Sequence, residues 1–156
     1  MTEPAPTRIV ADADVLAADV LVGGHSRAAL DRVREHSWLT LVASDPLLDD
    51  AEAVLTDLGD ASLAQDWRDR IEGASERVDH PAGDHPALAS AYRGGAMHLL
   101  TLDESLLSAS AGAAIGGRIE TSVRHPRAFA TLFDAESLYR AAVGGDYPGP
   151  DRDPRE

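Results

Sequence analysis

Short apolar runs alternate with longer amphipathic segments along the whole chain. Each run is four to six residues long, is rich in Val, Ile and Leu, and stops at polar residues, which is typical of buried strands. A further short segment is more polar and fits an edge strand. The pattern predicts strands at residues 7–11, 38–43, 97–101 and 118–123, and a brief edge strand at 76–79.

Between the runs, apolar residues recur at the spacing of a helix. The clearest example follows the second run, where Pro46 stands in the first turn, Gly59 marks the end, and one apolar stripe predicts the buried face. The stripe consists of Leu47, Leu48, Ala51, Val54, Leu55 and Leu58. Cap residues and glycine stops predict helices at 14–22, from Ser26 through Val33, at 46–58, 62–71, 86–93, 104–114, 126–133 and 136–143.

Strands and helices that alternate at this spacing predict an α/β fold with parallel pairing. Parallel neighbours need crossover connections, so we expect a three-layer α/β/α sandwich around a central parallel sheet of four to five strands. We expect one domain at residues 7–143, a disordered N-terminus at 1–6, and a disordered tail at 144–156 that is too rich in Gly, Pro and charge to pack. In such sheets, ligands bind beyond the carboxyl ends of the strands.

The composition removes several classes of function. The 156 residues include no cysteine, so disulfides, thiol nucleophiles and Cys-ligated zinc or iron–sulfur centres are excluded. No segment has the length and apolarity of a membrane span, and the first residues lack the apolar core of a signal peptide. We therefore expect a cytoplasmic protein without a membrane partner.

The charge is strongly one-sided. The net charge is −13, and all 14 basic residues are arginine. A lysine-free, Asp-rich composition resembles that of proteins from salt-accumulating halophiles, in which surface acidity serves solubility. High salt also screens the repulsion of a polyanion such as RNA. Any acidic site must therefore be recognised by the position of its residues and not by their number.

Four acids fall where an active site of this fold would be. Asp12 ends the first predicted strand and Asp103 follows the third, while Asp50 lies one turn into a helix and Asp84 precedes another. Clustered carboxylates are hard to ionise together unless a cation neutralises them, and hard oxygen ligands suit Mg²⁺ or Mn²⁺. We expect these four acids to meet at one end of the sheet.

These segments together resemble the PIN-domain family of metal-dependent ribonucleases. The resemblance runs from about Arg8 to Phe133 and is carried by Ile9-Val-Ala-Asp12-Ala-Asp14-Val-Leu16, by Ser44 to Leu55, by Asp84 to Ala91, by Ala96 to Leu107 with its Thr101-Leu-Asp103 ending, and by Ser122 to Phe129. It implies that Asp12, Asp50, Asp84 and Asp103 ligate the metal. It also implies that Asp14 and Thr101 are auxiliary polar residues.

Two positions depart from the family pattern. The second acid is more often Glu in the family, and Asp49 and Glu52 are rival candidates beside Asp50. Asp14 stands where Asn, Ser or Thr is usual, which adds a negative charge to the site.

Structural roles compete with the functional ones. Any single acid can be a solvated surface residue, and Asp84 can be a helix N-cap. A zinc site of His80 and His85 with neighbouring acids is less favoured than a surface loop. Trp38 and Trp67 fit a core better than a base-stacking platform. Five arginines could contact phosphates, namely Arg34, Arg93, Arg118, Arg124 and Arg127.

The sequence leaves two hypotheses of function. The first is a Mg²⁺- or Mn²⁺-dependent endoribonuclease, in which metal-activated water hydrolyses RNA phosphodiesters. By resemblance it would be either the toxin of a toxin–antitoxin pair, with an antitoxin protein as partner, or an RNA-processing enzyme, and it could form a homodimer. The second is a PIN-fold module with a weak or inactive site that binds RNA or protein.

Overall fold

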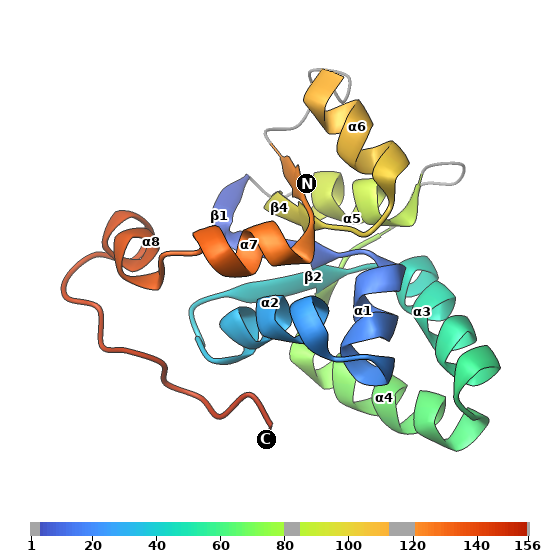
Figure 1. The fold of residues 1–156 in the computed structure, drawn as a ribbon. Coiled ribbons are helices and arrows are strands. Elements are labelled where there is room, and N and C mark those ends of the chain that lie inside the picture. The colour runs from blue at the N-terminus through green and yellow to red at the C-terminus, as the bar shows by residue number, and fades with distance from the viewer. Residues whose placement is uncertain (1–3, 80–84, 113–120, 156) are drawn as a thin grey trace.

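The fold is built on one five-stranded, all-parallel sheet with the order β3-β2-β1-β4-β5. The computed structural model describes residues 4–79, 85–112 and 121–155, and the side chains of 109–112 are not described. Figure 1 shows the sheet crossing the molecule, with helices on both faces. The strands are β1 (Ala5–Ala11), β2 (Thr40–Ala43), β3 (Ser75–Arg77), β4 (Ala96–Leu100) and β5 (Ser122–Arg124).

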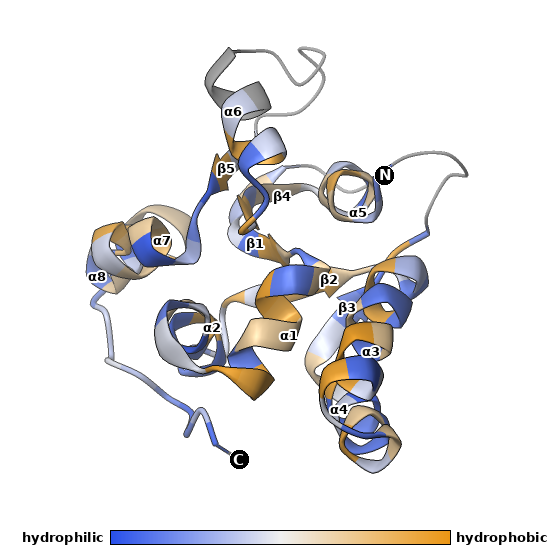
Figure 2. Ribbon diagram, turned by 45° about the vertical axis from the view of Figure 1, so that its right-hand side comes forward, coloured by the Kyte–Doolittle hydropathy of each residue, from blue (hydrophilic) through white to orange (hydrophobic). Residues whose placement is uncertain are grey.

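Helices complete the three layers that the strand and helix pattern predicts. On one face of the sheet lie α1, α2 and α7, while α5 covers β1, β2 and β4 on the other (Figure 2). The α3 and α4 helices pack against each other on the β3 side of the sheet. The helices are α1 (Ala13–Leu21), α2 (Gly24–Arg34), α3 (Asp45–Leu58), α4 (Ala61–Ala74), α5 (Pro86–Gly94), α6 (Glu104–Gly112), α7 (Pro126–Leu132) and α8 (Ala135–Ala142).

The predicted fold class is confirmed, and the predicted strands occur with shifted ends. The largest shift concerns the strand expected at 118–123, which becomes β5 at Ser122–Arg124, while residues 113–120 lie outside the described part of the chain. The short edge strand becomes β3, which pairs with β2. Local apolar patterning therefore locates the strands to within a few residues.

Two details of the helices differ from the prediction. Leu58 belongs to the predicted apolar stripe of α3 but is 73% exposed, because it stands in the last turn, beyond the part of α3 that packs. Ser26 does not cap α2. The helix begins at Gly24 after Gly23, whose φ of 82° favours glycine, and Ser26 is buried inside the first turn.

The core is formed by the central strands and the helix faces turned towards them. Ile9, Val10 and Leu99 are fully buried, as is Leu55 of α3. Trp67 is also buried, and Trp38 packs against the core edge beside Tyr139, which agrees with the structural role expected of both tryptophans.

The C-terminal tail contacts the end of α2, although its composition predicts that it would not pack. The backbone N–H groups of Asp151 and Arg152 donate to the Glu35 carbonyl oxygen over 2.9 and 3.1 Å. The Tyr147 hydroxyl lies 2.6 Å from Nε2 of the buried His36. The last carbonyl groups of a helix have no hydrogen-bond partners within the helix. Here the tail supplies N–H donors to one of them. Polar contacts thus hold a segment that has little apolar surface.

The longest helices, α3 and α4, have 14 residues each. Within the described residues, none combines the length and apolarity needed to cross a membrane.

Candidate functional site

The strand order reverses between β1 and β4, in the middle of the sheet. From β1, the chain crosses to β2 and β3 on one side, and later to β4 and β5 on the other. The carboxyl ends of β1 and β4 therefore flank the switch point, where open α/β sheets bind ligands. Asp12 directly follows β1, and Thr101 directly follows β4.

Asp12 is held by partners on both sides. It is the N-cap of α1, where its Oδ1 accepts a hydrogen bond from the Ala13 N–H over 2.8 Å. Its Oδ2 accepts one from the Thr101 hydroxyl over 2.8 Å. The Thr101 oxygen in turn accepts from the Asp103 N–H over 3.0 Å. Thr101 therefore links the two acids that follow the central strands, and its buried hydroxyl orients Asp12.

Asp14 lies one residue into α1 and turns towards the loop after β4. Its carboxylate accepts from the Leu102 N–H over 3.2 Å. Burial, together with the negative charges of Asp12 and Asp103, raises the pKa of this carboxyl from 3.8 to about 6, against the opposing effect of hydrogen bonds from the backbone. The negative charges of Asp12 and Asp103 therefore act directly on Asp14.

These acids line a groove of about 460 Å³ at the carboxyl edge of the sheet. Asp12, Asp14 and Asp103 form part of its wall, and Asp50 of α3 and His85 line it as well. His85 is the N-cap of α5, where its Nδ1 accepts from the Ala87 N–H over 3.2 Å. The structure thus brings three of the four acids predicted as ligands to one groove.

The orientation of α3 separates the candidates for the second acid. Asp50 faces the groove. Asp49 and Glu52 instead point to α4, where Arg68 lies 2.7 and 3.1 Å from their carboxylates. Successive helical residues are about 100° apart, so neighbouring acids cannot share one face. The geometry favours Asp50 over both rivals as a residue of the groove.

The described residues do not form the predicted metal-binding cluster of four carboxylates. Asp84 lies outside the described residues, as does His80 of the alternative zinc site. Within the part of the chain that is described, no three His, Asp or Glu side chains stand close enough together to hold a metal ion. Both oxygens of Asp12 already accept hydrogen bonds, and Asp50 is a short, exposed acid on α3. Carboxylate oxygens that repel one another fit a divalent cation. The described carboxylates do not converge on one point.

The amino-acid sequence did not reveal the apolar rim of the groove. Val22 and Leu58 are 79% and 73% exposed, and both line the groove beside the acids. Each stands at the C-terminal end of an amphipathic helix, where the apolar pattern predicts burial. No local signal distinguishes such positions from the core.

The arginines that could contact phosphates have different surroundings. Arg34 is committed to Asp19 and Asp31. Arg124 ends β5 beside Thr101, whose N–H donates to the Arg124 carbonyl oxygen over 3.0 Å. Arg118 lies outside the described residues.

The molecule is a parallel α/β protein with an acidic groove at the switch point of its sheet, and this arrangement is compatible with a PIN-like fold. Over residues 3–155, the chain matches a family of unknown function, DUF7384, and it belongs to that family. Neither the curated proteins nor the solved structures include a significant match.

Proposed function

We propose that the protein is a PIN-like endoribonuclease that depends on Mg²⁺ or Mn²⁺. The observation that carries the proposal is the position of the acids. Asp12 and Asp103 follow the two central strands at the switch point, and Asp14 and Asp50 line the same groove. The raised pKa of Asp14 supports it, because an acid cluster with a perturbed pKa is typical of functional sites.

The residues of the groove would divide the work. Asp12, Asp50 and Asp103 would hold the cation, together with Asp84 by the resemblance, and a divalent cation in such a site activates water and stabilises charge on a phosphate. Thr101 would keep the Asp12 carboxylate in place. Asp14 would serve as an auxiliary acid in the wall of the groove. The biological setting would be a toxin with an antitoxin partner or an RNA-processing enzyme, and a homodimer belongs to the same proposal.

The test is cleavage of single-stranded and structured RNA in molar KCl with Mn²⁺ or Mg²⁺. Changing even a second-shell partner of a metal ligand often costs 10–100-fold in activity, so Asp12→Asn and Asp103→Asn should lower cleavage by at least about 100-fold. Asp50→Asn should also lower it. Asp49→Asn is the matched control, because this acid lies on the same helix but faces Arg68, and it should leave cleavage unchanged.

A second candidate is a PIN-fold module that binds RNA or protein without cleaving it. Two observations favour it: the described acids do not converge on one point, and Val22 and Leu58 are exposed on the rim. Under this hypothesis, wild type and all three groove variants are equally inert with every metal and RNA. Binding of labelled RNA, followed by fluorescence anisotropy, then separates an RNA module from a protein-binding one.

A further inference from the structure

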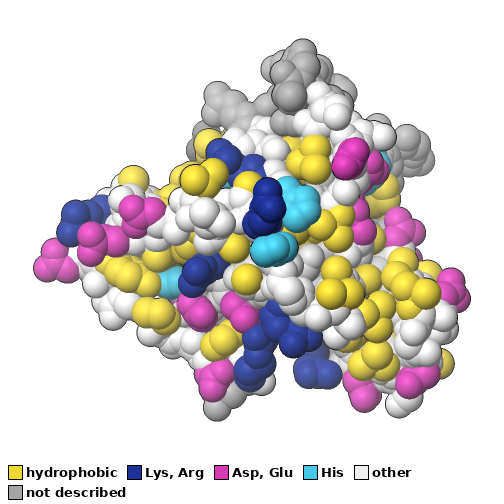
Figure 3. Space-filling view, in the orientation of Figure 1, with side chains coloured by type: hydrophobic (Ala, Val, Ile, Leu, Met, Phe, Trp, Pro, Cys, Tyr) yellow, Lys and Arg dark blue, Asp and Glu magenta, His cyan; other side chains and the backbone are white. Residues whose placement is uncertain are grey.

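A second groove lies away from the acidic one and shares no lining residue with it. It has a volume of about 560 Å³, its walls come from α1, α2 and α4, and β2 and the residue before it contribute to its floor. Residues 152–155 of the tail lie along its rim. Figure 3 shows arginine side chains gathered where the two lower lobes of the molecule meet. A volume of this size is typical of small-molecule sites.

The groove concentrates positive charge in a protein that is otherwise acidic. Five of the 14 arginines line it, against two aspartates, and Asp31 pairs with two of these arginines from outside the lining, which leaves an excess of two positive charges. The whole chain has a net charge of −13. An anion is therefore repelled by most of the surface and attracted at this groove. The arginines are Arg27, Arg34, Arg70, Arg152 and Arg155.

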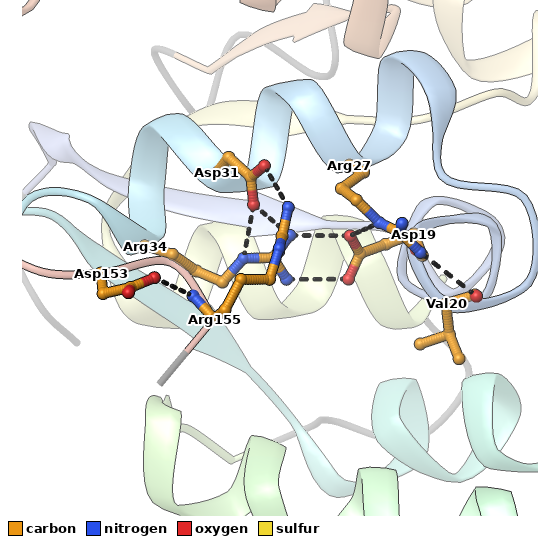
Figure 4. Close-up of polar contacts among 7 residues, drawn as sticks. All are labelled: Asp19, Val20, Arg27, Asp31, Arg34, Asp153 and Arg155. Atoms are coloured by element: carbon orange, nitrogen blue, oxygen red, sulfur yellow. Dashed lines mark hydrogen bonds and ion pairs between the residues drawn. The ribbon is translucent and has the colours of Figure 1, made fainter.

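Part of this charge is fixed by a partly buried ion-pair network (Figure 4). The two terminal nitrogens of Arg34 donate to the carboxylate of Asp19, which is 7% exposed, over 2.7 and 2.8 Å. Arg34 and Arg155 also donate to Asp31, over 2.7 and 2.6 Å. The network joins α1, α2 and the tail, so these arginines form the frame of the groove.

Two other arginines have donors to spare. Arg70 lies on the exposed side of α4, and within the described residues it has no hydrogen bond or ion pair. Arg152 uses one terminal nitrogen to donate to the His36 carbonyl oxygen over 2.9 Å. A guanidinium carries five N–H donors in a fork that suits carboxylate and phosphate. Arg70 and Arg152 can therefore bind an anion without breaking the frame.

The apolar lining is only partly accessible. Its most accessible large side chains are Val20, Leu41, Leu63 and Ile71. Leu16, Leu30 and Leu39 line the groove but are only 2%, 3% and 4% exposed, and Trp67 is 7% exposed. A partner helix would need several well-exposed side chains to cover, and a nucleobase would need an open aromatic face. A slender hydrocarbon chain can contact such a lining along its length. The limited accessibility of the lining therefore favours a chain-like ligand over a peptide helix or RNA.

We propose that this groove binds a small amphipathic anion: a hydrocarbon chain that ends in a carboxylate or phosphate. The chain lies along the groove above Leu39 and Trp67, and the head group binds the rim arginines Arg70 and Arg152. The site is independent of the nuclease proposal, since the two grooves have separate linings.

Trp67 allows the binding to be followed directly. The chain has two tryptophans, and only Trp67 lines this groove, so Trp38→Phe leaves a single reporter. The probes are decanoate, decyl phosphate, decyltrimethylammonium and decanol, all below their micelle-forming concentrations and in the salt of the cleavage assay. One or both anions should shift Trp67 emission with saturation, whereas the cation and the alcohol should bind at least about tenfold more weakly. Binding of one anion alone identifies the head group.

Matched variants distinguish this site from general surface adsorption. Arg70→Gln combined with Arg152→Gln should weaken anion binding by about tenfold or more, since one charge-assisted hydrogen bond is worth about that factor. Arg140→Gln on α8 should have no effect. Ala74→Phe fills the groove from an exposed position on α4 and should abolish binding, whereas Ala53→Phe on the exposed side of α3 should not.

Three results would overturn the proposal. The first is equal binding of the cationic and anionic probes, and the second is unchanged binding in Ala74→Phe, with circular dichroism confirming that the variant is folded. The third is the absence of binding by either anion. If a designed acidic amphipathic peptide then bound with the same dependence on Arg70 and Arg152, the groove would be assigned to a protein partner. None of these results bears on RNA cleavage.

Discussion

Some buried polar side chains of this protein have hydrogen-bond partners, and others do not. Asp12 is 7% exposed, but both of its carboxylate oxygens accept hydrogen bonds. His98 of β4 lies against Phe129, with 5.7 Å between ring centroids, and its Nδ1 is buried without a partner among the described residues. Burial lowers the pKa of His98 below 6.5, and the charge of Arg124 lowers it further. The folded protein therefore favours the neutral form of the His98 imidazole.

His98 should make stability fall on acidification. As the pH falls through about 6.5, the unfolded chain takes up a proton at His98 that the folded protein still excludes, so the free energy of unfolding decreases. The slope from one such group is at most about 1.4 kcal/mol per pH unit. Urea unfolding between pH 8 and pH 5 measures it. His98→Leu should flatten the pH dependence relative to wild type, and His25→Gln, an exposed control, should not. Identical slopes for wild type and His98→Leu would contradict the assignment.

At the scale of elements, one close contact sets the distance between α5 and β2. Gly94 stands at the end of α5, and a Cβ atom there would lie 2.3 Å from Cγ1 of Val42, which is fully buried. Real atoms do not approach so closely, and Val42 has no room to move aside. The absence of a side chain at residue 94 therefore lets the helix pack directly on the strand.

Gly94→Ala should lower the free energy of unfolding by about 2–3 kcal/mol, as overpacking of a core does. Val42→Ala removes the clashing methyl groups, so the double variant should be at least about 1 kcal/mol more stable than the sum of the two single effects predicts. Chemical denaturation of the four proteins gives this coupling. Gly73→Ala is the control, because Gly73 of α4 has open space around it, and it should stabilise the protein slightly. Additive effects of Gly94→Ala and Val42→Ala would show that the contact is not close.

At the scale of the whole molecule, charge and fold oppose each other. A net charge of −13 repels itself in the compact state. Arginines reduce this repulsion locally, as Arg68 does among the acids of α3 and α4. Most of the excess remains on the surface, where salt can screen it.

The melting temperature should therefore rise by several degrees between about 0.1 and 2 M KCl, because the Debye length shrinks from about 10 Å to below 3 Å. Thermal unfolding followed by circular dichroism measures this. Sucrose at equal osmolality is the control for solvent exclusion, and its effect should be smaller. A melting temperature that does not change with KCl would show that the acidic surface does not limit stability.

The features that depend on local periodicity can be predicted from the amino-acid sequence alone. Short apolar runs predict strands, and apolar residues at helical spacing predict helices. Both patterns depend only on residues that are close along the chain. Asp12 and Asp103 could be placed at one edge because parallel strands end on the same side. For the same local reason, Leu58 and Val22 were indistinguishable from core residues.

The packing of whole elements determined the features that depend on contacts between distant segments. It set the strand order, turned Asp50 to the groove and Asp49 to Arg68, and placed the polar tail on the carbonyl end of α2. It also gathered five scattered arginines around one groove. These features follow from how whole elements pack, and a charged residue has the same local pattern whether its partner is solvent, an ion pair or a ligand.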